Sequence, residues 1–349
     1  DLFLIQDEVL YNAALNNLAG EGYANYLQSL PSQGVRYNDI LDRATSCEVP
    51  ALAGSVLECR ASSPIHLWGQ LDYNWRRVSS DVETGAAKSK RFTGVIGGDV
   101  TIANAAILGA SLGVVQNKTR TNRFGGEKVE GDGFQVGLYG AYDPGAFYVK
   151  AMTTYTWLDG ESRRTLDMAN YAPGGTFAGE LRGDPDATMW TFGLHGGYRV
   201  PIGASSVATP YVNYDYVNAK LKSFTETGLD GANLTVLGGR SKHSFLTGGV
   251  KFATQLGGLV PELNLGYRYR FGKKRSYFQA AFIGDTDCDF TIESAVAKRG
   301  TFLAGLSIGG KLGPVDLRIG YEGEFNADVK SHIGNFKVVL PLGGRAAPP

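Results

Sequence analysis

The sequence predicts an all-β fold: a transmembrane, antiparallel, up-and-down β-barrel of about twelve strands. Three observations lead to it. Many segments alternate apolar and polar side chains, most clearly residues 315–325, where every odd position except Gly323 is apolar. The connections between these segments mostly alternate between short and long, and aromatic side chains gather near both ends of the segments. Because successive side chains of a strand point to opposite faces, each segment offers one face to lipid and one to water.

The composition fits a large barrel and argues against a nucleic-acid-binding protein. The chain has 349 residues, and its 34 basic and 34 acidic residues cancel, whereas nucleic-acid binding requires a basic excess. Its 48 glycines are typical of crowded or bent strands and unusual for a helical enzyme.

Residues 1–30 are expected to form a helix, because apolar side chains recur among Ala and Asn and Pro31 follows. A helix of about 26 residues would span roughly 40 Å, close to the thickness of a bilayer. The charged residues of this segment are all acidic: Asp1, Asp7, Glu8 and Glu21. Because these charges and several Asn exclude contact with lipid, the helix requires a polar sheath.

Residues 31–64 are predicted to be a linker that contains Cys47 and Cys59. Since no His or further Cys lies beside this pair, a local disulfide is favoured over a zinc site. Closing so short a loop would add about 3 kcal/mol of stability in the chain-entropy model. Cys288, in a polar loop, is expected to be a free thiol.

The barrel is predicted to occupy residues 65–342, and residues 343–349 form a C-terminal extension. Twelve strands are expected, at residues 67–78, 92–102, 107–118, 134–142, 147–158, 188–199, 211–221, 244–254, 262–271, 301–311, 315–325 and 333–342.

The connections predict how the barrel lies in the membrane. Short turns follow the second, fourth, sixth, eighth and tenth strands, at Asn104 and at residues 143–145, 201–203, 257–258 and 313–314. Outer-membrane barrels have short turns at the periplasm and long loops outside. With an even number of strands, both ends of the barrel and the linker with its cysteines are then periplasmic. We therefore expect the outer membrane of a Gram-negative bacterium.

Aromatic residues support a membrane-spanning barrel over a soluble sandwich, which has no reason to carry two aromatic belts. The outer ends of the strands carry Trp75, Trp157, Trp190, Tyr269 and Phe271, and the inner ends carry Tyr142, Tyr198 and Tyr211.

The polar face of the strands predicts a charged lumen. Its inward-pointing charges include Arg76, Lys150, Arg199, Arg268, Arg270, Arg318 and Glu322. Placing the acidic leading helix inside the pore would pair Glu21, and Asp7 or Glu8, with luminal arginines through charge-assisted hydrogen bonds. The alternative is a helix free in solution beside a solvated lumen.

No motif in the sequence predicts catalysis. Residues 109–113 spell G-x-S-x-G, but that motif requires a strand–turn–helix and here lies within a strand. The four histidines have no metal-ligand spacing. Glu322 and Glu324 point to one face of one strand and are interpreted as luminal charge. We therefore expect no catalytic residue, no metal site and no cofactor.

A leading helix with Leu18-Ala19-Gly20-Glu21, a linker and about twelve strands resembles the translocator domain of autotransporters, which carry out type V secretion. Further similarity lies in residues 134–142, 147–151 and 261–272, and the resemblance covers nearly the whole chain. It implies a monomeric, non-enzymatic barrel with the helix threaded through its pore. The function implied is to export an N-terminal passenger and to anchor or release it at the cell surface. The partners implied are outer-membrane lipid, the passenger, the barrel-assembly machinery and periplasmic chaperones.

Two features differ from the usual family pattern. The last strand carries its outward signal at Phe336, Val338, Leu340 and Leu342, but the chain does not end on an aromatic residue. One subfamily cleaves its passenger at an Asn-Asn pair in the pore helix, and Asn16-Asn17 matches that pair without the basic residues that usually follow it.

Two other functions stay open from the sequence alone. A porin-like diffusion channel would share the barrel. An outer-membrane hydrolase would need a cluster such as His243 with loop acids, and a surface role for these residues is favoured.

Overall fold

The computed structural model describes residues 5–46, 63–79, 85–102, 106–122, 126–171, 174–283 and 285–342. Two helices come first, α1 (Glu8–Ala19) and α2 (Glu21–Ala44). Twelve long strands follow: β1 (Ile65–Val78), β2 (Ala86–Ile102), β3 (Ala106–Asn122), β4 (Glu127–Tyr142), β5 (Phe147–Asp167), β7 (Ala187–Tyr198), β9 (Ser206–Leu221), β11 (Leu234–Thr254), β12 (Leu259–Phe271), β15 (Gly300–Leu312), β16 (Val315–Phe325) and β17 (Val329–Leu342). Five short strands join them: β6 (Ala178–Gly183), β8 (Val200–Pro201), β10 (Phe224–Thr225), β13 (Tyr277–Phe282) and β14 (Asp285–Glu293).

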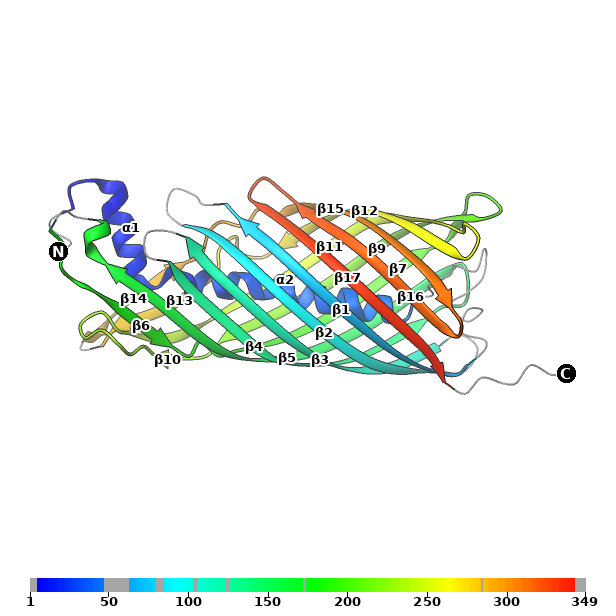
Figure 1. The fold of residues 1–349 in the computed structure, drawn as a ribbon, viewed down its shortest axis with the longest axis horizontal. Coiled ribbons are helices and arrows are strands. Elements are labelled where there is room, and N and C mark those ends of the chain that lie inside the picture. The colour runs from blue at the N-terminus through cyan, green and yellow to red at the C-terminus, as the bar shows by residue number, and fades with distance from the viewer. Residues whose placement is uncertain are drawn as a thin grey trace.

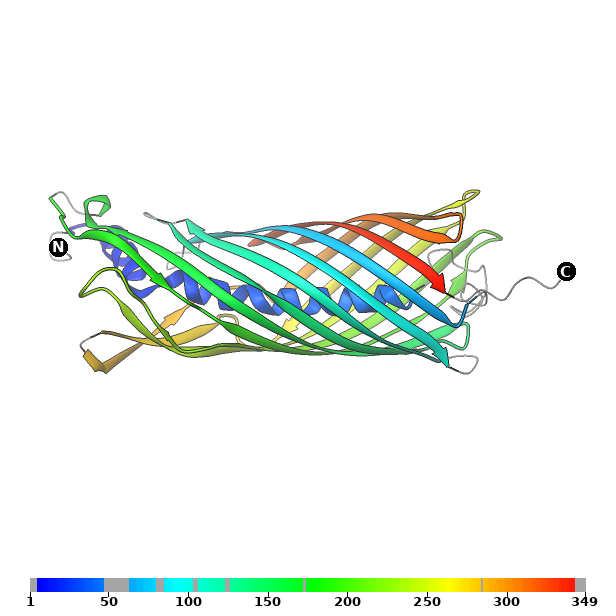
Figure 2. The same cartoon turned by 60° about the horizontal axis from the view of Figure 1, so that its bottom comes forward.

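The long strands close into a barrel around α2, as Figures 1 and 2 show. Each pairs antiparallel with its neighbour in sequence, and β17 returns to pair with β1 from Ile65↔Leu342 to Val78↔Val329. Closure leaves the long strands without an unpaired edge, and a sheet in lipid needs this because its backbone groups have no water to bind. The prediction of a barrel with about twelve strands and an N-terminal helix is thereby confirmed for the part of the chain that the structure describes.

The two ends of the barrel differ. The connections after β2, β4, β7, β11 and β15 are short, apart from the small β8 segment, and lie at what we call the turn end, on the right of Figure 1. The opposite loop end carries α1 and the short strands β6, β10, β13 and β14. There the long strands run further than predicted: β5 continues to Asp167 and β11 starts at Leu234. The sequence missed these extensions because they carry polar side chains on both faces, such as Glu161 and Arg164, and lose the two-residue alternation.

The side chains follow the predicted faces. On β15, Leu306 points outward with 62% of its surface exposed, whereas Leu303 points inward and is 9% exposed. On β12, residues 263, 265, 267, 269 and 271 lie on the outer face, as the alternation predicted.

The leading helix differs from its prediction in two ways. Gly20 adopts a left-handed conformation, with φ of 76°, and divides the predicted helix into α1 and α2. Helix α2 then continues past Pro31 to Ala44, so residues 31–44 belong to the helix and not to a linker. Proline removes one hydrogen bond and normally ends a helix. Burial of α2 on nearly every side outweighs that loss. Among the described residues, no helix has both the length and the apolar character needed to cross a bilayer.

Candidate functional site

The lumen of the barrel and the helix within it form the candidate site. Helix α2 runs along the barrel axis (Figure 2) and lies off-centre, against β3, β4, β5, β7, β9 and β11. On the other side, a polar cavity of about 100 Å³, continuous with solvent, lies between the helix and β12, β15 and β16. Asn264, Ser307 and Arg318 are among the side chains that line this cavity.

Apolar contacts hold the half of α2 nearest the loop end. Tyr23, Tyr26, Leu27 and Leu30 are at most 2% exposed and pack against wall residues. The wall residues in this cluster include Val115, Val129, Leu158, Val217, Leu221, Leu234, Val236 and Phe278. A second apolar cluster packs Tyr37, Ile40 and Leu41 of the other half of the helix against the wall, so apolar contacts hold α2 along most of its length.

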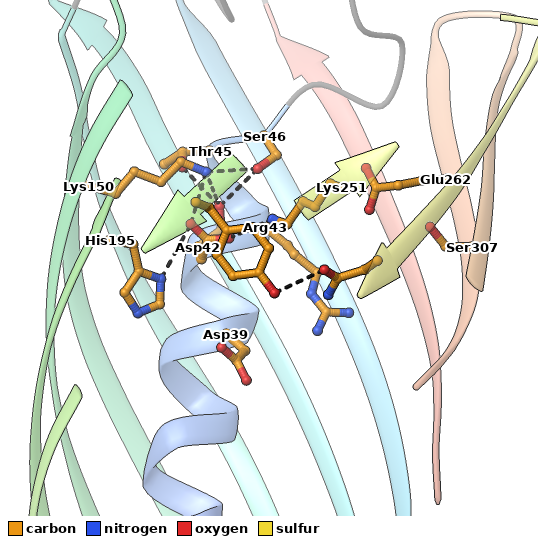
Figure 3. A network of polar contacts seen from close by, with 12 residues as sticks. Asp39, Asp42, Arg43, Thr45, Ser46, Lys150, His195, Lys251, Glu262 and Ser307 are labelled. Carbon is orange, nitrogen blue, oxygen red and sulfur yellow. Dashed lines mark hydrogen bonds and ion pairs between the residues drawn. The ribbon is translucent and has the colours of Figure 1, made fainter. Parts of the chain in front are cut away.

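Ionic contacts hold the half of α2 nearest the turn end (Figure 3). The Asp42 carboxylate lies 3.1 Å from the Lys150 ammonium, and 3.5 Å from both Lys251 and His195. These three partners come from β5, β11 and β7, so one helix residue binds three strands. His195 also contacts Asp215 at 3.1 Å, and Asp215 accepts a hydrogen bond of 2.8 Å from Asn38 of the helix.

Two arginine clusters tie α2 to the opposite wall. Arg36 of the helix pairs with Asp72 of β1 and, at 2.8 Å, with Glu322 of β16. Arg43 reaches the same Glu322 at 2.5 Å. Arg268 of β12 pairs with Asp39 of the helix at 3.2 Å and with Glu324 at 2.8 Å. Because burial removes water from these charges, each needs its partner.

Four residues of the predicted lumen set contact the helix, but through helix residues 32–43 and not through Glu21, Asp7 or Glu8: Arg76, Lys150, Arg268 and Glu322. Arg76 donates a 2.7 Å hydrogen bond to the Ser32 hydroxyl. Glu21 is buried at the start of α2, where it accepts hydrogen bonds from the backbone N–H of Gly85 and from Asn25.

Other members of that set lie elsewhere. Asp7 and Glu8 are exposed at the loop end, where Asp7 accepts a hydrogen bond from the backbone N–H of Leu10 at the start of α1. The prediction that they enter the lumen was wrong, because α1 folds outside the pore beyond the break at Gly20 (Figure 2).

Three further arginines bind wall and loop groups. Arg199 forms a two-point ion pair with Asp143 of the adjacent turn, at 2.7 and 2.8 Å. Arg270 donates to the Ala297 carbonyl, and Arg318 donates to Ser307.

Most of the predicted belt residues face outward. Tyr142, Trp157, Trp190 and Tyr198 are between 43% and 54% exposed, and Trp75 and Tyr269 are half-buried on the same outer face. Tyr211 is a correction: it points into the lumen, is 6% exposed and donates a hydrogen bond to Asn264. The inward position follows from β9, whose odd-numbered residues are the buried ones.

On the last strand, Phe336, Val338, Leu340 and Leu342 share the outer face. Cys47, Cys59 and residues 343–349 lie outside the described residues, so the disulfide stays a prediction.

Sequence reasoning missed the charged residues of the helix's inner half: Arg36, Asp39, Asp42 and Arg43. They were assigned to the linker because Pro31 was interpreted as a helix end. Their spacing contained a signal, since residues 36, 39 and 43 share one face of a helix. The serine of the G-x-S-x-G segment, Ser111, lies within β3 and its hydroxyl contacts the Tyr37 hydroxyl at 2.9 Å. Ser111 thus contacts the helix, and the segment around it is a continuous strand without the strand–turn–helix that the nucleophile motif requires.

The comparisons with known proteins agree with this architecture. No curated protein matches the sequence. Among solved structures, the chain is similar to the translocator domain of autotransporter NalP from Neisseria meningitidis, with a TM-score of 0.71 and 14% identity over 92% of this chain and 99% of that one. It is also similar to the transport unit of autotransporter AIDA-I from Escherichia coli, with a TM-score of 0.56 and 12% identity over 78% and 89% of the two chains.

A third similar structure is the β-domain of the Bordetella autotransporter BrkA, with a TM-score of 0.55 and 16% identity over 78% of this chain and 98% of that one. The family model described as autotransporter β-domain matches residues 67–324, which is most of the barrel. With a closed twelve-stranded barrel, a helix in its lumen and this match, the chain belongs to the autotransporter β-domain family.

Proposed function

We propose that α2 is the trailing segment of an exported chain and that it closes the pore once the passenger is outside. Membership of the family establishes the general function: a non-enzymatic translocator domain in a Gram-negative outer membrane, which exports its own passenger. The observation that carries the proposal is the continuous burial of α2 inside the closed barrel. A segment so fully enclosed, with its N-terminal end at the loop end, lies where the last exported residues would stop.

We infer that the loop end faces the outside and the turn end faces the periplasm. Short turns and long loops divide this way in bacterial outer-membrane barrels. In this orientation α2 enters from outside, reaches the periplasmic side at Ala44, and the chain returns as the outward-running β1 (Figure 1). A passenger joined before α1 would then emerge at the cell surface.

Assembly partners are part of the proposal. The outward row of Phe336, Val338, Leu340 and Leu342 on the closing strand would be recognised by the barrel-assembly machinery, after periplasmic chaperones deliver the unfolded chain. Its support is the position of β17 at the seam with β1, where the barrel closes.

Conductance in planar bilayers tests the role of α2. We expect the full chain to conduct weakly, because apolar packing around Tyr23, Tyr26 and Leu30 seals the loop end. Removal of residues 1–44 should raise single-channel conductance severalfold. Equal conductance of the two proteins would contradict closure of the pore by α2.

Export is tested with a reporter protein joined before Asp1, scored by protease accessibility on intact cells.

A diffusion channel is the second candidate, because the polar cavity beside α2 already opens to solvent. A full-length chain that conducts strongly and leaves the reporter inaccessible would favour that candidate over export.

A further inference from the structure

The break between α1 and α2 is held by the barrel wall and not by the helix itself. Gly20 is left-handed and, as the N-cap residue, has no side chain to cap the first backbone N–H groups of α2. Instead the Glu127 carboxylate of β4 accepts a hydrogen bond from the backbone N–H of Gly22. On the other side of the break, Arg164 of β5 donates to the carbonyls of Asn17 and Leu18, the last turn of α1.

Glu127 and Arg164 are direct cross-strand partners in the β4–β5 ladder. One pair of neighbouring wall residues therefore separates the two helices, with the anion at the N-terminus of α2 and the cation at the C-terminus of α1. Both charges match the helix dipoles. Arg164 is itself fixed by Glu226, at 2.5 Å, and both side chains are at most 2% exposed.

The other end of α2 is held in the complementary way. The Lys150 ammonium of β5 donates to the Asp42 carbonyl at 2.7 Å, and the Lys337 ammonium of β17 donates to the Arg43 carbonyl at 2.6 Å. These carbonyls lie in the last turn of α2, where a helix lacks internal donors and carries partial negative charge. Two wall lysines thus cap the C-terminus.

Strand β5 carries a contact at both ends, and its length matches that of the helix. The 14 steps from Lys150 to Arg164 extend about 46 Å along the strand, or about 35 Å along the barrel axis for a strand tilted by about 40°. Helix α2 rises about 32 Å over the 21 steps from Glu21 to Asp42, and Leu18 lies just beyond the break at Gly20. The contacts at both ends therefore favour one axial position of the helix.

We propose that β5, together with Glu127 of the adjacent β4 and Lys337 of β17, fixes the stopping position and the direction of α2, and we call these wall residues the ruler. A segment that entered with its N-terminus at the turn end would instead bring the positive end of its dipole against the two wall lysines, Lys150 and Lys337. This inference rests on the proposed function at one point only: it treats the position of α2 as the place where export ends. The residues involved are positioning residues.

A charge-swapped variant, Glu127→Lys with Lys150→Glu, tests the ruler while keeping the net charge. The matched control is Glu130→Lys with Lys118→Glu, which swaps a pair 2.5 Å apart on the wall near Glu127. The readouts are amide hydrogen exchange of residues 21–44 and channel openings in bilayers, both on the purified full chain.

We expect the first swap to raise exchange across α2 and the frequency of openings at least tenfold, with the control within about twofold of the original protein. Identical exchange profiles for the two swaps would overturn the ruler.

The single variants Glu127→Gln and Lys150→Met decide the question if the swapped barrel does not fold. Loss of Glu127 should raise exchange in the first turn of α2, and loss of Lys150 in the last turn. Unchanged exchange in both turns would also overturn the proposal. These measurements need no export, so a failed reporter assay would count against the proposed function and leave the ruler to be judged by exchange alone.

Discussion

Single charged residues in the lumen act as structural elements because water cannot reach them freely. Arg36 is the clearest case: its side chain is 6% exposed and pairs with Asp72, 3% exposed, and with Glu322. A buried ion pair contributes little compared with well-packed apolar residues, but removing one partner leaves the other charge uncompensated. The lumen therefore tolerates loss of a single partner poorly.

Arg36→Met should destabilise the protein by about 3–5 kcal/mol, because Asp72 would remain buried without its cation. The control is Arg163→Met, whose pair with Glu161 lies on the exposed outer wall at 3.0 Å and should be worth about 0–1 kcal/mol. The free energy of unfolding in urea, with the barrel in lipid vesicles, measures both. Equal losses would contradict the view that burial decides the value of these pairs.

Helix α2 shows at the scale of one element how shape directs packing. Gly34 allows the helix backbone to approach β7 and β9, where an added Cβ would lie 2.7 Å from a Thr191 methyl carbon and 3.0 Å from the Met189 sulfur. That close approach presses the helix to one side and leaves the polar cavity on the other.

Gly34→Ala should destabilise the helix in its pore by about 1–3 kcal/mol through overpacking, although alanine favours an isolated helix by about 1 kcal/mol. Gly334→Ala is the control, because a Cβ at that position of β17 meets nothing within 4 Å. Amide exchange of residues 21–44 reports the effect. Slower exchange in the Gly34 variant would show that helix propensity outweighs packing here.

Predictability from sequence differs between strands and helices for a physical reason. Strand positions, faces and short turns could be predicted, because one face meets lipid and the two-residue period is visible. The helix has no such contrast: it is enclosed by a polar and apolar wall together, so its side chains show no simple stripe. Pro31 then suggested an end that burial overrides, and the position of Gly20 within an Ala-Gly-Glu-Gly run gave the only local hint of the break.

At the scale of the whole molecule, the outer face of the barrel wall meets lipid and its inner face meets the helix and a wet cavity. Lipid-facing residues such as Leu306 sit a few positions from cavity-facing residues such as Leu303 on the same strand. Leu303 lies opposite Glu324 in the β15–β16 ladder.

Leu306→Lys should cost about 2–4 kcal/mol, since it places a charge on the lipid face. Leu303→Lys, the same change on the inner face, should cost at least about 1 kcal/mol less, because the cavity is wet and Glu324 is across the strand pair. Unfolding in urea from vesicles compares the two. A larger loss for the inner variant would contradict the assignment of faces.

The covalent path of the chain lets the barrel anchor any passenger that is joined before α1. Helix α2 continues through the turn end into β1, which is paired on both flanks with β2 and β17. Outward tension on a passenger is therefore carried by the backbone into the wall, so retention at the surface needs no adhesive contact with lipid or with another protein. Shedding into the medium then demands scission of a peptide bond on the passenger side of α2.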